Sequence, residues 1–254
     1  MLAAMVEPEG PVRRLIARVK RVEDPTLRTF ALYARALPHW AACGHLHRAR
    51  LIERYLAGTD EPRLQIGVGP NGLPGWLDAD LIAGDVFVDL TRPLPLPDAS
   101  FAYVLGEHVI EHIPDRSAER LLAELRRILR PDGVLRLTTP DLRKHIALYE
   151  DRSPVVSREE YCRVLDRASG RPHERPAQML NDAMRLWGHR WIYDEEDLVA
   201  RLRSAGFERI VRVEPGESEH PVLRNLERHG DVDWLNRAEA MTLEAGAASP
   251  VAGR

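Results

Sequence analysis

The chain has 254 residues, which is enough for one well-developed hydrophobic core with a small appendage. Hydrophobic residues make up 44% of it and charged residues 30%, as is ordinary for a soluble globular protein. The 36 lysines and arginines against 39 acidic residues give a net charge of −3. This balance argues against a nucleic-acid partner, which usually requires a strongly basic face.

Cysteine spacing and hydropathy argue against several further classes of protein. Cys43 and Cys162 are far apart in the chain, so neither a zinc site nor a disulfide framework is indicated. No stretch reaches the roughly 18 consecutive apolar residues of a membrane span. The N-terminal residues lack the pattern of a signal peptide. We therefore expect a cytoplasmic protein with free thiols.

The first part of the chain has helical spacing of its apolar residues. One run extends from Leu15 to Val22, and a second extends from Leu27 to Leu56, in which Pro38 is expected to break the helix. We assign residues 1–61 to an N-terminal helical extension.

From Pro62 the pattern changes to short apolar runs of the kind that form buried parallel strands. The fifth predicted strand follows a helix at about 115–130, whose apolar residues share one face, and the turn Pro131-Asp132-Gly133. Strand, helix, tight turn and strand form a βαβ unit, which implies parallel pairing. The first five strands are predicted at residues 64–66, 76–81, 85–89, 101–105 and 134–139.

The second half of the chain begins with residues 141–190, which show helical and irregular patterns without a strand signal. A helix is expected from Asp194 to Ala205, because Asp194 can cap its start and a glycine follows its end. Strands are predicted at 207–213 and 238–245. Within the polar connection between them, residues 223–229 are expected to form a solvated loop.

Together these elements predict an α/β fold with a mostly parallel, Rossmann-like sheet of about seven strands. A helical cap precedes the sheet, and a helical insertion follows its fifth strand. We assign this domain to residues 62–245 and expect residues 246–254 to form a disordered tail.

A short glycine loop, Gly67-Val68-Gly69, follows the first predicted strand. Open parallel sheets bind ligands at the carboxyl ends of their strands, and glycines there let the backbone approach a ligand closely. The same glycines followed by Pro70 and Asn71 are equally good turn formers, so the loop alone leaves both interpretations open. The third glycine of a dinucleotide fingerprint is missing, which argues against NAD.

An aspartate follows each of the next two predicted strands, Asp80 after the second and Asp89 after the third. A carboxylate at such a strand end either caps a turn or accepts hydrogen bonds from the hydroxyls of a ribose or the amine of adenine. The glycine loop and the two acids together are what an adenosine-containing ligand needs.

These motifs lie in the runs LQIGVGPNGLPGWLDADL, VFVDLTRPLPLPDASFAYVLGEHVIEHI and ELRRILRPDGVLRLTTPDL. The combination resembles the class I S-adenosylmethionine-dependent methyltransferases, and most of all a bacterial branch of predicted methyltransferases with unassigned acceptors. The resemblance covers roughly residues 62–245. It implies a class I methyltransferase sheet with S-adenosylmethionine as the cofactor, and it does not identify the acceptor.

The resemblance also implies a role for each matching position. Gly67-Val68-Gly69 would lie under the methionine and ribose part of the cofactor, and Asp80 would hold the ribose hydroxyls. Asp89, with the backbone of Leu90, would lie at the adenine. Gly106-Glu107-His108, after the fourth strand, would line the floor beneath the methyl group.

One departure from the family pattern concerns the connection between the first two strands, where a full helix is usual. Only six residues, Pro70 to Gly75, separate Gly69 from Trp76, whereas a parallel crossover needs about 10–12 residues. Either the helix is reduced to a turn before a short second strand, or Asp80 is misplaced. In the second case Asp78 is the substitute for the ribose contact.

The motif HVIEH places His108 and His112 four residues apart. A histidine near the methyl group could position an acceptor or take its proton, because the pKa of imidazole lies near neutrality. His108 is our candidate for this role, whereas His112 is expected to be a partly buried capping residue. The motif lacks the HExxH order and a third ligand is not evident, so no metal site is expected.

A denser polar and aromatic cluster, His189-Arg190-Trp191-Ile192-Tyr193, follows the helical insertion. His189 is a second candidate for the catalytic role. Arg190 could bind an anionic or sugar-like acceptor by a bidentate contact, with Trp191 or Tyr193 stacking on it. The alternative is a structural cluster that closes the edge of the sheet.

These observations predict transfer of a methyl group to a small-molecule or glycan-type acceptor, with oxygen as the acceptor atom. The protein must then align the acceptor about 3–3.5 Å from the methyl group and exclude water. Two alternatives remain. One is a cofactor-binding domain without transfer activity that acts as a partner or sensor, and the other is an RNA or protein methyltransferase. The sequence does not predict the oligomeric state.

Overall fold

The structure is a computed structural model that describes residues 25–44, 47–69, 71–228 and 234–247, with side chains from residue 31 onward. The predicted helical run Leu15–Val22 and the part of the predicted tail after Ala247 lie outside the described residues.

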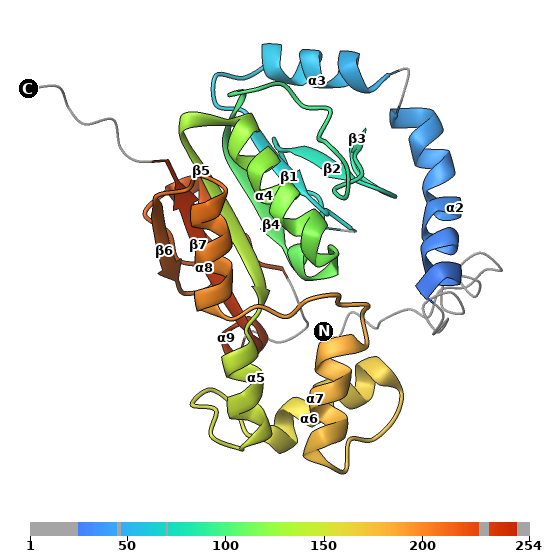
Figure 1. Cartoon of the computed structure of the whole chain (residues 1–254), viewed down its shortest axis with the longest axis vertical. Helices are drawn as coiled ribbons and strands as arrows, with labels where there is room; N and C mark the ends of the chain where they lie inside the picture. The colour runs from blue at the N-terminus through green and yellow to red at the C-terminus, as the bar shows by residue number, and fades with distance from the viewer. Residues whose placement is uncertain (1–24, 45–46, 70, 229–233, 248–254) are drawn as a thin grey trace, which may run out of the picture.

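Among the described residues, seven strands form one sheet in the order β3-β2-β1-β4-β5-β7-β6 (Figure 1). Strands β1 to β5 pair in parallel, and β7 runs antiparallel between β5 and β6. The predicted α/β fold with a mostly parallel, Rossmann-like sheet is therefore confirmed. The strands are β1 (Arg63–Ile66), β2 (Leu77–Asp80), β3 (Val86–Phe87), β4 (Phe101–Glu107), β5 (Leu129–Pro140), β6 (Arg209–Val213) and β7 (Ala240–Gly246).

One face of the sheet is covered by helices α4 (Asp115–Ile128) and α8 (Glu195–Ser204), which lie side by side in Figure 1. Helix α4 forms because its apolar residues recur on one stripe, and Leu121, Leu122 and Leu125 of that stripe are all buried. This packing buries the residues that the sequence placed on the inner face of the helix.

The transition from α4 to β5 differs from the prediction. The helix already ends at Ile128, and β5 begins at Leu129. Phe101 pairs with Leu129 and Tyr103 with Val134, so the residues between Leu129 and Val134 bulge out of the ladder. Pro131-Asp132-Gly133 is thus a bulge within the strand and does not form a turn before it, because a bulge also accommodates proline and glycine.

Two N-terminal helices are described, α2 (Pro25–Cys43) and α3 (Arg48–Ala57), and α2 lies beside β3. The prediction that Pro38 breaks the helix is wrong, because Pro38 lies inside α2. A proline removes one backbone hydrogen bond and favours a kink, but it does not forbid the next turn. The chain turns at Gly44, whose carbonyl accepts the N–H groups of His47 and Arg48.

The connection between β1 and β2 has no helix among its described residues. The N–H of Asn71 donates to the carbonyl of Val68, and that of Trp76 donates to the carbonyl of Leu73, so the described residues on the two sides of position 70 form turns. β1 and β2 nevertheless pair in parallel. The first of the two options for this connection is therefore correct: the helix is reduced to turns before a short strand.

Helices α5 (Leu142–Tyr149), α6 (Arg158–Ser169) and α7 (Pro176–Arg185) form the predicted insertion. Figure 1 shows them grouped beyond the carboxyl end of β5, next to α9 (Leu235–Glu239). They share a separate small core, which includes Leu148, Tyr161, Met179 and Leu235. None of the helices in the described ranges has the length and apolar character that a membrane crossing requires.

The opposite face of the sheet is covered by an irregular segment, residues 214–228, which contains the short helix η2 (Pro221–Leu223). Leu223 is fully buried and packs with Trp76 and Leu105. The expectation of a solvated loop at residues 223–229 is therefore wrong for Leu223. The apolar surface of β4 and β5 on this face supplies the partner that the sequence pattern did not reveal.

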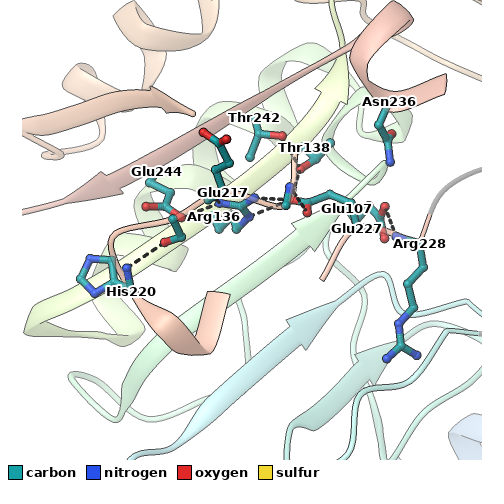
Figure 2. A network of polar contacts seen from close by, with 12 residues as sticks. Glu107, Arg136, Thr138, Glu217, His220, Glu227, Arg228, Asn236, Thr242 and Glu244 are labelled. Carbon is teal, nitrogen blue, oxygen red and sulfur yellow. Dashed lines mark hydrogen bonds and ion pairs between the residues drawn. The ribbon is translucent and has the colours of Figure 1, made fainter. Parts of the chain in front are cut away.

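Arg136 of β5 fixes this segment to the sheet. Its side chain is fully buried, and its Nη2 and Nη1 atoms each lie 2.5 Å from a carboxylate oxygen, of Glu227 and Glu244 respectively. Nη1 also donates to the carbonyl of Glu217 at 2.9 Å. Figure 2 shows the guanidinium at the centre of these contacts. Two buried carboxylates thus compensate one buried cation, and the contacts with Glu217 and Glu227 anchor the segment at two points.

Replacement of Arg136 by alanine is expected to lower the free energy of unfolding by about 3–5 kcal/mol, because it leaves buried carboxylates without their cation. Urea denaturation followed by circular dichroism measures the change. The matched control is Arg163→Ala, which removes an exposed pair with Glu159 and should cost about 0.5 kcal/mol or less. Equal stability of the two variants would contradict the role of Arg136.

The glycine loop after β1 gives a second prediction. Gly67 and Gly69 have φ angles of +62° and +53°. A Cβ at Gly67 would lie 2.3 Å from Cγ2 of the buried Val109, whereas a Cβ at Gly69 would meet nothing within 4 Å. Gly69→Ala should therefore cost about 1–2 kcal/mol for the left-handed backbone alone. Gly67→Ala should cost about 1–3 kcal/mol more, because it also overpacks the core.

Thermal and urea denaturation of the two variants test this difference. If Gly67→Ala is no less stable than Gly69→Ala, the close approach of the loop to Val109 is wrong.

Candidate functional site

The glycine loop lies against the carboxyl end of β2. The N–H of Gly67 donates to the carbonyl of Ala79 at 2.9 Å, and the N–H of Gly69 donates to Oδ2 of Asp80 at 3.2 Å. Val68 between them is buried. The structure therefore brings together the loop and the first of the two acids that the sequence singled out.

Asp80 retains hydrogen-bonding capacity at this edge. Its Oδ1 accepts the N–H of Ile82 at 2.7 Å, and its Oδ2 accepts the N–H of Gly69. A carboxylate has about four lone-pair sites, so these two contacts leave room for two hydroxyl donors. Asp78 lies further back in β2, with its Oδ2 packed against Gly72, and burial raises the pKa of its carboxyl. The geometry favours Asp80 over Asp78 for a ribose contact.

Asp89 follows β3 and lies under α2. Its Oδ2 accepts the hydroxyl of Tyr33 at 2.7 Å and lies 3.2 Å from Nε of Arg92, and its Oδ1 accepts both the N–H and the hydroxyl of Thr91. Leu90, the next residue, is buried in the main core. Asp89 thus caps the turn after β3 and also joins this turn to the N-terminal helix.

A cavity of about 270 Å³ opens beside Asp89, between α2 and β3. Aromatic and aliphatic side chains line it together with one carboxylate and one guanidinium. Its lining residues are Tyr33, Ala36, Leu37, Trp40, Phe87, Asp89 and Arg92.

An adenosine needs an apolar slot for the flat ring, a polar group at the edge of that slot and acceptors for two vicinal hydroxyls. The slot beside Asp89, the spare lone pairs of Asp80 and the open space above Gly69 meet these needs. The described residues therefore fit the adenosine part of S-adenosylmethionine, which the sequence implied.

The end of β4 provides Gly106, Glu107 and His108. A Cβ at Gly106 would lie 2.9 Å from Leu137 and 3.0 Å from Val109, so this glycine is required by packing between neighbouring side chains. Glu107 accepts the N–H of Arg228 at 2.7 Å. His108 has a φ of +49°, which turns the chain away from the sheet and into η1 (Ile110–His112).

His108 contacts two polar groups with its ring. Its Nδ1 lies 3.2 Å from Oε1 of Glu111, and its Nε2 lies 3.2 Å from Oδ1 of Asn236. Burial disfavours the charged imidazole, but the hydrogen bond and charge of Glu111 outweigh burial and raise the pKa of His108 to about 9. Burial also opposes ionisation of Glu111, yet His108 lowers the pKa of this carboxyl to about 2. The two residues form a buried ion pair.

A second cavity, of about 180 Å³, lies between the exit of β4, the end of β5 and the helical insertion. Histidines dominate its lining: His108, His112, Pro140, His145, Ala183, Trp187, His189 and Glu239. The rings of His112 and His189 meet edge to face with their centroids 4.9 Å apart. Burial lowers the pKa of His189 to about 4. Both predicted catalytic histidines therefore face one cavity.

Backbone hydrogen bonds hold His189 at the second cavity. The N–H groups of Arg190 and Trp191 both donate to the carbonyl of Glu111, at 2.6 and 3.2 Å. Further along, Tyr193 forms a parallel bridge with Asp141 at the end of β5. The segment before α8 is thus held between η1 and the sheet.

The three residues expected to bind the acceptor occupy different surroundings. Tyr193 is fully buried in the main core, and Trp191 donates from Nε1 to Asp197 while Arg201 lies 5.0 Å over its ring. Neither residue lines the second cavity. These contacts favour the structural alternative for Trp191 and Tyr193. Arg190 is exposed and directly follows His189.

Sequence reasoning missed several residues of both cavities. Tyr33 and Trp40 were treated only as part of a helical cap, although the aromatic content of that helix was a signal. His112 is expected from the sequence to be a partly buried capping residue, and Glu239 carries no local signal. Only the fold shows that these residues face a cavity, because their neighbours come from distant segments.

The family described as "Methyltransferase domain" matches residues 31–212. No curated protein matches the chain.

Several solved structures are similar. Phosphoethanolamine N-methyltransferase 2 from Haemonchus contortus, in complex with S-adenosyl-L-methionine, is 12% identical with a TM-score of 0.45, over 92% of this chain and 60% of that chain. The same enzyme with phosphomonomethylethanolamine and S-adenosylhomocysteine is also 12% identical with a TM-score of 0.43, over 82% of this chain and 54% of that chain. The chain thus spans less than two thirds of the length of these two relatives.

An S-adenosylmethionine-dependent methyltransferase from Mesorhizobium loti is 17% identical with a TM-score of 0.42, over 76% of this chain and 95% of that chain. The family match covers well over half of the present chain. The chain belongs to the family of methyltransferase domains, which confirms the methyltransferase family expected from the sequence.

Proposed function

We propose that this enzyme transfers the methyl group of S-adenosylmethionine to an oxygen atom of a small-molecule or glycan-type acceptor. The observation that carries the proposal is the contact between the glycine loop and Asp80, whose carboxylate keeps lone pairs for two hydroxyls.

The cofactor-binding residues follow from the arrangement at this edge. Gly67-Val68-Gly69 lies under the methionine and ribose part, and Asp80 accepts the ribose hydroxyls. The adenine occupies the cavity beside Asp89, with the backbone of Leu90 along its edge. The lone pairs of Asp89 are engaged by Thr91 and by the exposed Tyr33 and Arg92 side chains, so one of the latter two contacts gives way to the adenine amine.

The acceptor occupies the histidine-lined cavity, next to the floor formed by Gly106 and Glu107. The sulfonium of the cofactor supplies an activated methyl group, so the protein has to align the acceptor and exclude water. His108 and His189 face this cavity and position the acceptor oxygen. The neutral imidazole of His189 accepts the hydroxyl proton as the methyl group passes from the sulfonium to this oxygen and S-adenosylhomocysteine is released. Arg190, which is exposed beside His189, is the candidate for an anionic or sugar group of the acceptor.

The cofactor site is tested by calorimetry with S-adenosylmethionine and S-adenosylhomocysteine. Asp80→Asn should weaken binding of both about 10- to 100-fold, because hydrogen bonds to a charged acceptor contribute about 1.5–3 kcal/mol. The matched control is Asp132→Asn, an exposed aspartate in the bulge of β5, which should bind as the parent does.

Two outcomes would count against the cofactor assignment. If neither compound binds the parent protein, the proposed function fails. If Asp80→Asn binds as tightly as the parent, the ribose contact is assigned to the wrong residue.

Transfer is tested by incubating the protein with methyl-labelled cofactor and fractionated extract of the host, and by identifying the fraction that takes up label. His189→Ala should lower the rate of labelling about 100-fold, since a loss of acceptor alignment has this effect. It should leave cofactor binding unchanged. His220→Ala, on the opposite face of the sheet, serves as the control. Tight cofactor binding without labelling of any fraction would favour the alternative of an inactive binding domain.

A further inference from the structure

Three potential metal ligands meet at the edge of the histidine-lined cavity. Glu111 and His112 come from η1, and His189 comes from the segment before α8. One ligand atom of each residue lies within 4.8 Å of those of the other two. No metal site is expected from the sequence pair His108 and His112, and the fold instead brings His112 together with Glu111 and the distant His189.

One of these residues carries a buried polar atom without a partner in the described structure, namely Nδ1 of His189. Glu111 is fully buried, and its Oε1 lies 3.2 Å from Nδ1 of His108, with which it forms an ion pair. A buried nitrogen without a hydrogen-bond partner is destabilising unless a ligand compensates it.

The donor set matches borderline divalent transition metals. Two imidazoles and one carboxylate bind Zn²⁺ in catalytic sites that keep an open position, and the same set binds iron in the facial-triad oxygenases. Mg²⁺ and Ca²⁺ prefer oxygen ligands and fit less well. A tetrahedral ion holds its ligand atoms roughly 3.4 Å apart, given metal–ligand distances of about 2.0–2.2 Å. Side-chain movements of about 1 Å therefore bring the three ligand atoms to the separation that a tetrahedral ion requires.

The surroundings support a site of this kind. Oε2 of Glu111 accepts the hydroxyl of Thr139 at 3.0 Å, which orients the carboxylate. His112 and His189 line the cavity of about 180 Å³, so positions of the ion not taken by the protein face that space. The backbone contacts of Arg190 and Trp191 to Glu111 fix the two ligand-bearing segments against each other.

We propose that Glu111, His112 and His189 bind a divalent transition-metal ion, and that its open positions take an oxygen atom of the acceptor. Coordination of the acceptor oxygen rests on the proposed function, whereas metal binding itself does not. The acceptor class is then narrowed to molecules with a hydroxyl, phenol or carboxylate oxygen that can coordinate a metal.

The test uses the full chain after treatment with a chelator. Titration with ZnCl₂, followed by calorimetry in the presence of a competing chelator, should show one ion bound per chain. Addition of CoCl₂ should produce visible absorption bands of a low-symmetry site. His112→Ala and His189→Ala should each weaken zinc binding more than about 100-fold, since even groups behind the ligands contribute 10- to 100-fold. His220→Ala is the matched control and should bind zinc as the parent does.

Circular dichroism establishes that each variant is folded, and the cobalt spectrum of the parent gives a readout that does not depend on any variant. The inference is overturned if the parent binds neither ion stoichiometrically, or if folded His112→Ala and His189→Ala proteins bind zinc like the parent. Calorimetry with S-adenosylmethionine on the same metal-free protein separates the two proposals. Cofactor binding without metal binding refutes only the metal site, and metal binding without cofactor binding refutes only the proposed function.

Discussion

The arrangement of the candidate active site depends on one buried residue, Glu111. Its carbonyl accepts the N–H groups of Arg190 and Trp191, while its side chain accepts the hydroxyl of Thr139 and pairs with His108. These contacts join the exit of β4, the end of β5 and the segment before α8. A buried carboxylate is tolerated only when its charge is compensated, so the three segments have to be in place together.

The short connection after β1 determines the arrangement of the cofactor side of the site, around Gly69 and Asp80. Since its described residues form turns and no helix, Gly69 stays close to Asp80 and the backbone remains accessible at the edge of the sheet. The same shortening leaves one face of the sheet without the usual helix. Residues 214–228 cover part of that face, with Leu223 in an apolar cluster and Arg136 as a buried anchor.

Local sequence signals predicted the sheet well because its strands are short apolar runs ended by glycine or aspartate. These signals failed where two backbone conformations of the same residues have similar free energies. Pro38 was expected to end a helix and lies inside one, and Pro131-Asp132-Gly133 forms a bulge within β5 where a turn was expected. In both cases packing of the surrounding segment decides between conformations that proline and glycine tolerate equally.

The sequence by itself determined the α/β fold, the glycine loop and the acids Asp80 and Asp89, because each depends on a few adjacent residues and on the period of the apolar pattern. Only the tertiary structure decided that His189 lies close to Glu111 and His112, and that Tyr193 belongs to the core. These facts depend on which distant segments pack together. The backbone hydrogen bonds from Arg190 and Trp191 to Glu111 contribute to that packing, and backbone groups carry no signal in the sequence.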